Sequence, residues 1–125
     1  MDLKVSDMMD MQRELWELHR DKWSPMEPEY GRNFLLWMVE ELGEVIAIVK
    51  KKGDAAIAAD PAVRGAFTEE MSDVLMYFMD TLLRYGVSPQ EFSEAYLNKH
   101  GANMGRDYDG QYARMFTGGQ DHGRG

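Results

Sequence analysis

Two long apolar stretches, each interrupted by carboxylates, dominate the pattern of this chain. The first runs from Phe34 to Val49, the second from Phe67 to Leu83, and each is apolar around most of a helical circumference. Glu40, Glu41 and Glu44 interrupt the first stretch. Because residues three or four apart lie on the same side of an α-helix, these three carboxylates share one side of a predicted helix.

The second stretch carries an acidic stripe of the same kind. Glu70, Asp73, Tyr77 and Asp80 follow the spacing i, i+3, i+7 and i+10, which places all four on one helix face. Moving an ionised carboxylate out of water costs several kcal/mol, whereas burying a leucine or valine returns only about 1.5–3 kcal/mol. Two buried helices with acidic stripes therefore require something that compensates the charge.

A hard divalent cation between the two helices would compensate it. Mg²⁺ binds oxygen ligands and typically combines carboxylates with substrate phosphates, and Mn²⁺ is the other candidate. The alternative is that both acidic motifs are solvated helix faces, but their position within apolar helices favours a metal site. The predicted ligands are Glu41, Glu44, Glu70 and Asp73.

The remaining pattern predicts an all-α fold, since no strand-like alternation occurs. A first helix is expected after Ser6 as N-cap and before Ser24, and a fourth from Pro89 to about His100. The second helix should end at Lys52, before Gly53. The third should begin after Asp60 and extend to Tyr85. Four helices account for the length of the chain.

Aromatic residues in the first predicted helix form a possible ligand-binding wall. Trp16, His19 and Trp23 follow the spacing i, i+3, i+7, which suits contact with a nucleobase, although ordinary packing is the alternative explanation. Asn33 is predicted either to cap the second helix or to face the site.

A cationic and amide-bearing segment follows the fourth helix. Lys99, Asn103 and Arg106 are suited to polyphosphate binding, and the alternative is a cluster that caps the helix C-terminus. No cysteine is present and no Ser/His/Asp order is evident. The nucleophile is therefore expected to be water, activated by a carboxylate.

The length and charge of the chain limit its domain organisation and the classes of partner that it can bind. The chain has 125 residues, and we expect one domain over residues 1–110 and a glycine-rich flexible tail over 111–125. A net charge of −8 argues against nucleic-acid binding. No signal-peptide pattern and no long uncharged apolar run is found, so we expect a cytoplasmic protein without membrane association.

Three motifs in order resemble one known family. EELGE at 40–44 and EEMSD at 69–73 match the EExxE and EExxD signature of the MazG-like all-α nucleoside triphosphate pyrophosphohydrolases. The KxxxNxxR pattern that starts at Lys99 matches the C-terminal motif of that family. The RNFLL start of the second helix, the Asp73 and Tyr77 pair and the spacing of His19 and Trp23 look most like the dCTP pyrophosphatase and dimeric dUTPase branch.

This resemblance implies hydrolysis between the α and β phosphates of a (deoxy)nucleoside triphosphate, which gives a monophosphate and pyrophosphate, for example in nucleotide-pool housecleaning. It implies Mg²⁺ at the four carboxylates, with Glu44 activating water and Glu40 as the alternative base. Phosphates would contact Lys99, Asn103 and Arg106. The residues implied in nucleoside binding are Trp16, His19, Asn33, Trp37 and, near the sugar, Tyr77.

The resemblance also implies a four-helix MazG-like bundle that assembles as a homodimer or homotetramer. The sequence agrees, because the second and third helices are apolar on more faces than one small bundle covers. Two other functions stay open: a phosphoribosyl-ATP-type pyrophosphatase, and a non-catalytic helical oligomer that binds a nucleotide or a protein partner.

Overall fold

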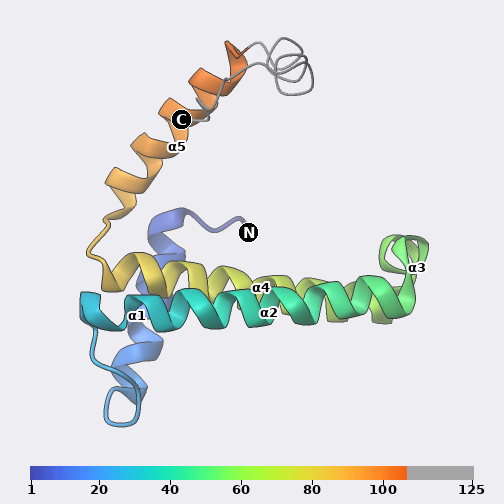
Figure 1. Ribbon diagram of the computed structural model, residues 1–125, viewed down its shortest axis with the longest axis horizontal. Coiled ribbons are helices and arrows are strands. Elements are labelled where there is room, and N and C mark those ends of the chain that lie inside the picture. The colour runs from blue at the N-terminus through green and yellow to red at the C-terminus, as the bar shows by residue number, and fades with distance from the viewer. Residues whose placement is uncertain (107–125) are drawn as a thin grey trace, which may run out of the picture. The chain divides into compact units, whose positions relative to one another are not determined.

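The structure, a computed structural model, describes residues 1–106 (Figure 1). These residues form five α-helices and one short 3-10 helix and contain no strand, which confirms the all-α class. The helices are α1 (Val5–His19), α2 (Gly31–Lys52), α3 (Asp54–Ala59), α4 (Pro61–Arg84) and α5 (Pro89–Met104), and the 3-10 helix is η1 (Pro28–Tyr30).

The chain divides into two compact units, Met1–Glu91 and Phe92–Gly125. The first unit holds α1 to α4 and the start of α5, and the second holds the rest of α5. The predicted domain boundary at 110 and the predicted tail over 111–125 lie outside the described residues. That division of the chain, the four-helix bundle and its assembly remain predictions.

An antiparallel pair of long helices is the frame of the first unit. α2 and α4 lie side by side along their length, α3 lies at the closed end of the pair, and α1 packs against α4 (Figure 1). The start of α4 is fixed locally, because the Asp60 carboxylate accepts hydrogen bonds from the N–H groups of Ala62 (3.0 Å) and Val63 (3.4 Å). These bonds confirm the prediction that Asp60 is the N-cap of this helix, with Pro61 at its first position.

The alanine-rich connection before Asp60 forms a helix that was not predicted. α3 covers the six residues Asp54–Ala59, so the described chain has five α-helices instead of four. Alanine has the highest helix propensity, which favours a helical turn here. Gly53, with a φ of 84°, separates α2 from α3, and the extended backbone of Asp60 before Pro61 ends α3.

Two other helix starts differ from the prediction. α1 begins at Val5 instead of after Ser6, because the Asp7 carboxylate accepts a hydrogen bond from the Lys4 N–H (2.9 Å) and stabilises an earlier start. α2 begins at Gly31, so Asn33 lies within its first turn and is not its N-cap.

At α5 the predicted cap is confirmed, since the Ser88 hydroxyl accepts a hydrogen bond from the Glu91 N–H (3.1 Å).

The Tyr85 ring, just after the end of α4, packs closely against Gly31 at the start of α2. A Cβ atom on Gly31 would lie 2.5 Å from the Tyr85 ring, which is far inside van der Waals contact. Gly43 differs, since a Cβ atom there meets nothing within 4 Å in the described chain.

A buried ion pair forms the polar centre of the first unit. Asp80 and Arg84 are 0 % and 1 % exposed, and the Arg84 Nε donates to the Asp80 carboxylate one turn earlier in α4. Gln12 on α1 donates its amide N–H to the other Asp80 oxygen (3.2 Å). Asp80, predicted as part of an acidic stripe, is thus neutralised by an arginine and anchors α1 to α4.

Candidate metal centre

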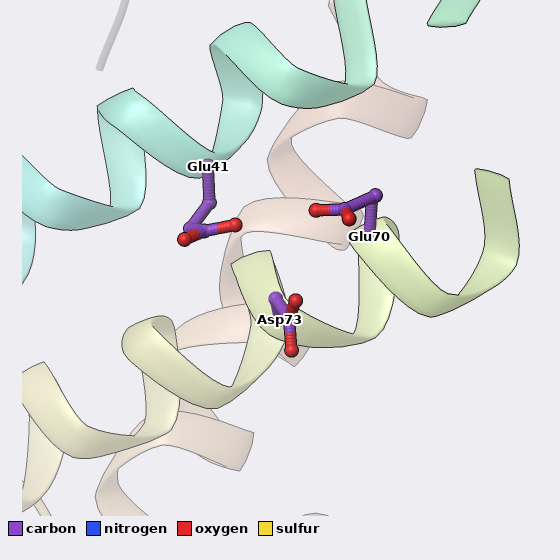
Figure 2. A group of neighbouring side chains, drawn as sticks. All are labelled: Glu41, Glu70 and Asp73. Atoms are coloured by element: carbon purple, nitrogen blue, oxygen red, sulfur yellow. The ribbon is translucent and has the colours of Figure 1, made fainter. Parts of the chain in front are cut away.

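Three of the four predicted metal ligands converge between α2 and α4. Glu41 projects from α2, while Glu70 and Asp73 lie one turn apart on α4 (Figure 2). One oxygen of each carboxylate lies within 4.8 Å of the others, and all three residues are half-buried. Because α2 and α4 are antiparallel neighbours, the EExxE motif of α2 lies opposite the EExxD motif of α4.

The three carboxylates repel one another in the absence of a cation. The pKa of Glu70 is raised above its ordinary value of 4.5 by partial desolvation, then by the negative charges of Asp73, Glu41 and Glu44. A hydrogen bond with the Glu41 carboxylate raises it further, since only the protonated acid can donate. Such a cluster holds excess negative charge that a divalent cation relieves.

The carboxylates fit a small oxygen-binding cation. Oxygen ligands at about 2.1 Å from Mg²⁺ lie about 3.0 Å apart at adjacent octahedral positions and about 4.2 Å apart at opposite ones. The three carboxylate oxygens lie within 4.8 Å of one another, and rotations of their flexible side chains would bring them to these separations. The residues present therefore suit Mg²⁺ or Mn²⁺.

Glu44 and Glu40 lie on α2 within one turn of Glu41, and both are exposed. Glu44 is not among the three converging carboxylates. Its negative charge nevertheless helps to raise the pKa of Glu70, which is one of them. Glu40 contributes to a raised pKa of Tyr77. Both keep water-accessible carboxylates close to the cluster, and their roles as bases remain predictions.

An aromatic pocket of about 420 Å³ opens next to the acidic cluster. Phe34 packs edge-on against Trp37 (ring centroids 4.9 Å), and Tyr77 lies 6.2 Å from Phe34 and 6.5 Å from Trp37. Asp73 lines the pocket and is also one of the three converging carboxylates. Within residues 1–106, the pocket is lined by Gln12, Leu15, Lys22, Trp23, Ser24, Phe34, Trp37, Asp73, Met76, Tyr77 and Asp80.

The Tyr77 hydroxyl joins the aromatic and acidic parts of this region. Its pKa is raised above 10.0 by partial burial, then by the charges of Glu41, Asp73 and Asp80, with Glu40 contributing least. The phenol therefore stays protonated at neutral pH and can donate a hydrogen bond to a ligand in the pocket.

The predicted nucleoside contacts divide into two groups. Trp37 and Tyr77 line the pocket, whereas Trp16, His19 and Asn33 are not among its described lining residues. The Trp16 indole N–H donates to the Ser24 carbonyl (2.8 Å), and the His19 ring stacks on Trp23 (4.9 Å). All five stay predictions as ligand contacts.

Several lining residues were not predicted from the sequence. Phe34 was grouped with the core of α2, and Lys22 was not singled out. Gln12 belongs to no recognisable sequence motif. Its side-chain amide lies next to Asp80 because α1 packs against α4. Trp23 belonged to a stripe whose ordinary explanation was packing, and its place in the pocket wall depends on the turn that follows α1.

The predicted phosphate-binding residues lie in the second unit. Lys99 and Asn103 are four residues apart on α5, and Arg106 follows the end of that helix, where its N–H donates to the Asn103 carbonyl (3.3 Å). The Asn103 side-chain oxygen is buried without a hydrogen-bond partner among residues 1–106. One turn of helix presents Lys99 and Asn103 on a common face, and phosphate binding remains a prediction.

Removing the charge of Glu70 is expected to have opposite effects on stability with and without Mg²⁺. Since its pKa is raised in the folded protein, its favourable contribution is fully present below about pH 4.5 and is lost as the pH rises through the raised pKa. Ionised Glu70 therefore opposes folding at pH 7 in EDTA, and Glu70→Gln should raise the melting temperature there. With Mg²⁺ at about 100 times its Kd, the free energy of unfolding of the wild type should rise by about 2.7 kcal/mol, which corresponds to several degrees in melting temperature. The Glu70→Gln variant lacks one proposed ligand, so Mg²⁺ should stabilise it less.

Melting curves at pH 5 and pH 7, in EDTA and in Mg²⁺, measure this reversal. Glu69→Gln, at the exposed neighbouring position, is the matched control and should behave as the wild type in both conditions. A Glu70→Gln variant that shifts in the same direction with EDTA and with Mg²⁺ would contradict a cation at this cluster.

No helix in residues 1–106 is long and apolar enough to cross a bilayer. Comparison with known proteins adds no relative: no protein-family model matches the chain, and neither a curated protein nor a solved structure matches it.

Proposed function

We propose that this protein is a Mg²⁺-dependent nucleoside triphosphate pyrophosphohydrolase of the MazG-like kind. The observation that carries the proposal is the position of Asp73, which belongs both to the converging carboxylates and to the lining of the aromatic pocket. A nucleotide presents a planar base at one end and phosphates at the other. One ligand can therefore place its base in the pocket and its phosphates at the acidic cluster.

The carboxylates of Glu41, Glu70 and Asp73, with Glu44 beside them, would hold Mg²⁺ or Mn²⁺. A bound Mg²⁺ supplies positive charge that stabilises the phosphate oxygens as negative charge develops on them. Water attacks the α-phosphorus, the bond to the bridging α–β oxygen breaks, and pyrophosphate leaves. Glu44, or Glu40 in its place, accepts the proton of the attacking water, because both are exposed to solvent beside the cluster.

The pocket provides contacts for a base. The rings of Trp23, Phe34, Trp37 and Tyr77 offer apolar faces for stacking. Lys22 contributes a cation at the same pocket. Lys99, Asn103 and Arg106 belong to the second unit, and phosphate binding by these residues stays a prediction.

Product analysis over a panel of ribo- and deoxynucleoside triphosphates tests this function. The proposal predicts monophosphate and pyrophosphate in Mg²⁺ and no turnover in EDTA. Diphosphate and orthophosphate as products would contradict α–β cleavage. No turnover of any nucleotide by folded protein would favour a different phosphate substrate, such as phosphoribosyl-ATP, or a binding role.

We further propose that the protein works as a homo-oligomer that pairs through α2. Leu35, Val39, Leu42, Ile46 and Val49 are exposed by 38 to 58 %. They alternate at spacings of four and three, which generates one apolar stripe along the helix. β-Branched residues alternate with leucine over its first four positions, the arrangement that two-stranded helix pairs favour. Only four hydrophobic side chains of the first unit are buried, Met9, Phe34, Val45 and Met79, which is fewer than the five exposed apolar residues of the α2 stripe.

Leu42→Lys is expected to dissociate the oligomer while the monomer stays helical. In a twofold interface the substitution occurs twice, and losing about 1.5–3 kcal/mol of burial per leucine raises the dissociation constant by roughly 100-fold or more. Sedimentation equilibrium measures the change. Leu97→Lys, at a leucine 68 % exposed on α5, is the control. A wild type that is monomeric at all concentrations would contradict the assembly.

A further inference from the structure

Arg84 makes more contacts than its role in an ion pair requires. Besides its bond to Asp80, its Nη1 donates to the Ser24 carbonyl (3.1 Å) and to the Pro25 carbonyl. Its guanidinium carbon lies 3.7 Å from the centre of the Phe34 ring. One buried side chain of α4 therefore contacts the segment after α1 and the start of α2.

These contacts reach the wall of the aromatic pocket. Ser24, Phe34 and Asp80 line that pocket and contact Arg84 directly. Gln12, a fourth lining residue, is connected to Arg84 through Asp80. Arg84 itself does not line the pocket. It can influence a ligand there only by holding other groups in place.

We propose that Arg84 is a positioning residue: it fixes the wall formed by Trp23 and Ser24 and thereby sets the affinity of the pocket for a nucleobase. The choice of a nucleobase as ligand rests on the proposed function, whereas the fixing of the wall does not. Trp16 supports the same wall, because its indole N–H donates to the same Ser24 carbonyl (2.8 Å).

The geometry of arginine matters more here than its charge. A guanidinium presents several N–H groups in one rigid plane and stacks on an aromatic ring, whereas a lysine ammonium is a single point on a flexible chain. Nε and Nη1 carry all the hydrogen bonds of Arg84, and Nη2 has no partner in residues 1–106. Lysine at this position could stay beside Asp80 but could not also reach both carbonyl groups.

Arg84→Lys separates positioning from stability, because it keeps a positive charge next to Asp80. We expect amide hydrogen exchange over residues 20–27 to become at least about tenfold faster, while exchange around Glu41 and Glu70 is unchanged. We expect the Kd for deoxynucleoside monophosphates, measured by calorimetry with all four bases, to rise about tenfold. In turnover, KM should rise by a similar factor with kcat retained. Arg64→Lys, at an exposed arginine of α4, is the matched control.

The outcomes are distinct. Unchanged exchange over 20–27 in the folded variant would overturn the fixing of the wall. Faster exchange with unchanged affinity and KM would overturn its effect on the ligand. A wild type that binds none of the four monophosphates would refute the nucleobase pocket of the proposed function, while the exchange result would still decide whether Arg84 fixes the wall.

A second variant covers the case in which Arg84→Lys does not fold. Trp16→Phe removes the other side-chain bond to the Ser24 carbonyl without leaving a buried charge. It should also speed exchange over 20–27 and raise the Kd. If it loosens the wall and leaves the Kd unchanged, the proposal fails.

Discussion

Glu41→Gln is expected to reduce Mg²⁺-dependent turnover of a nucleoside triphosphate by roughly a thousandfold or more, with the helical fold intact. Glu41 is the α2 member of the three converging carboxylates, and its replacement removes a negative charge from the α2 side of the proposed metal centre. A cation contributes several kcal/mol to the stabilisation of phosphate charge in the transition state, and each 1.36 kcal/mol corresponds to about tenfold in rate. Steady-state kinetics with saturating Mg²⁺ measures the loss.

Two further variants complete this test. Asp73→Asn removes a ligand charge from the other helix and should show a similar loss. Glu69→Gln, one residue before Glu70 but exposed, should keep the wild-type rate. Circular dichroism checks that each variant stays helical. Near-normal hydrolysis by Glu41→Gln and Asp73→Asn would refute the assignment of the metal centre.

The largest effect on stability is expected from Asp80→Leu, at about 3–5 kcal/mol, because it leaves the Arg84 charge buried without its partner. Asp80 is fully buried and accepts from both Arg84 and Gln12, so solvent cannot replace it. The double variant Asp80→Leu/Arg84→Met should recover only part of this loss. Replacing both members of a buried pair with apolar residues is often neutral, but the bonds of Arg84 to the Ser24 and Pro25 carbonyls are lost as well.

Urea unfolding in EDTA measures these changes, because it excludes any contribution from metal binding. Asp10→Leu, at an exposed position of α1, is the control and should stay within about 0.5 kcal/mol of the wild type. Equal stability of the wild type and Asp80→Leu would show that neither the ion pair within α4 nor the Gln12 bond from α1 to Asp80 stabilises the fold. A double variant less stable than Asp80→Leu would contradict the expected partial recovery, because it would show that the bonds of Arg84 to the Ser24 and Pro25 carbonyls contribute more than the unpaired charge costs.

The sequence was most informative where a local rule had a single physical solution. Asp60 before Pro61 predicted the start of α4, and the structure confirms it, because the backbone N–H groups of Ala62 and Val63 donate to the Asp60 carboxylate. The i, i+3 spacing of Glu70 and Asp73 predicted that both share a face, and the pairing of α2 with α4 brings Glu41 to that face. Periodicity was sufficient because helix geometry fixes these relations.

The sequence was less informative where tertiary contacts decide. Asp80 and Arg84 are four residues apart, but nothing in their spacing predicts that Arg84 also binds the carbonyl groups of Ser24 and Pro25. The turn after α1, which carries Trp23 into the pocket lining, is held by those contacts. Short-range competition also shifted one helix start, since Asp7 stabilises a helix that begins before Ser6.

The most direct test of the central claim is the binding of a paramagnetic divalent cation by these carboxylates. Titration with Mn²⁺, with the free ion measured by electron paramagnetic resonance, should show binding to the wild type that Mg²⁺ displaces. The Kd should rise at least about tenfold in Glu41→Gln, Glu70→Gln and Asp73→Asn, and should not change in Glu69→Gln. Equal binding of Mn²⁺ by all four variants, or none by the wild type with or without nucleotide, would contradict a metal centre between α2 and α4.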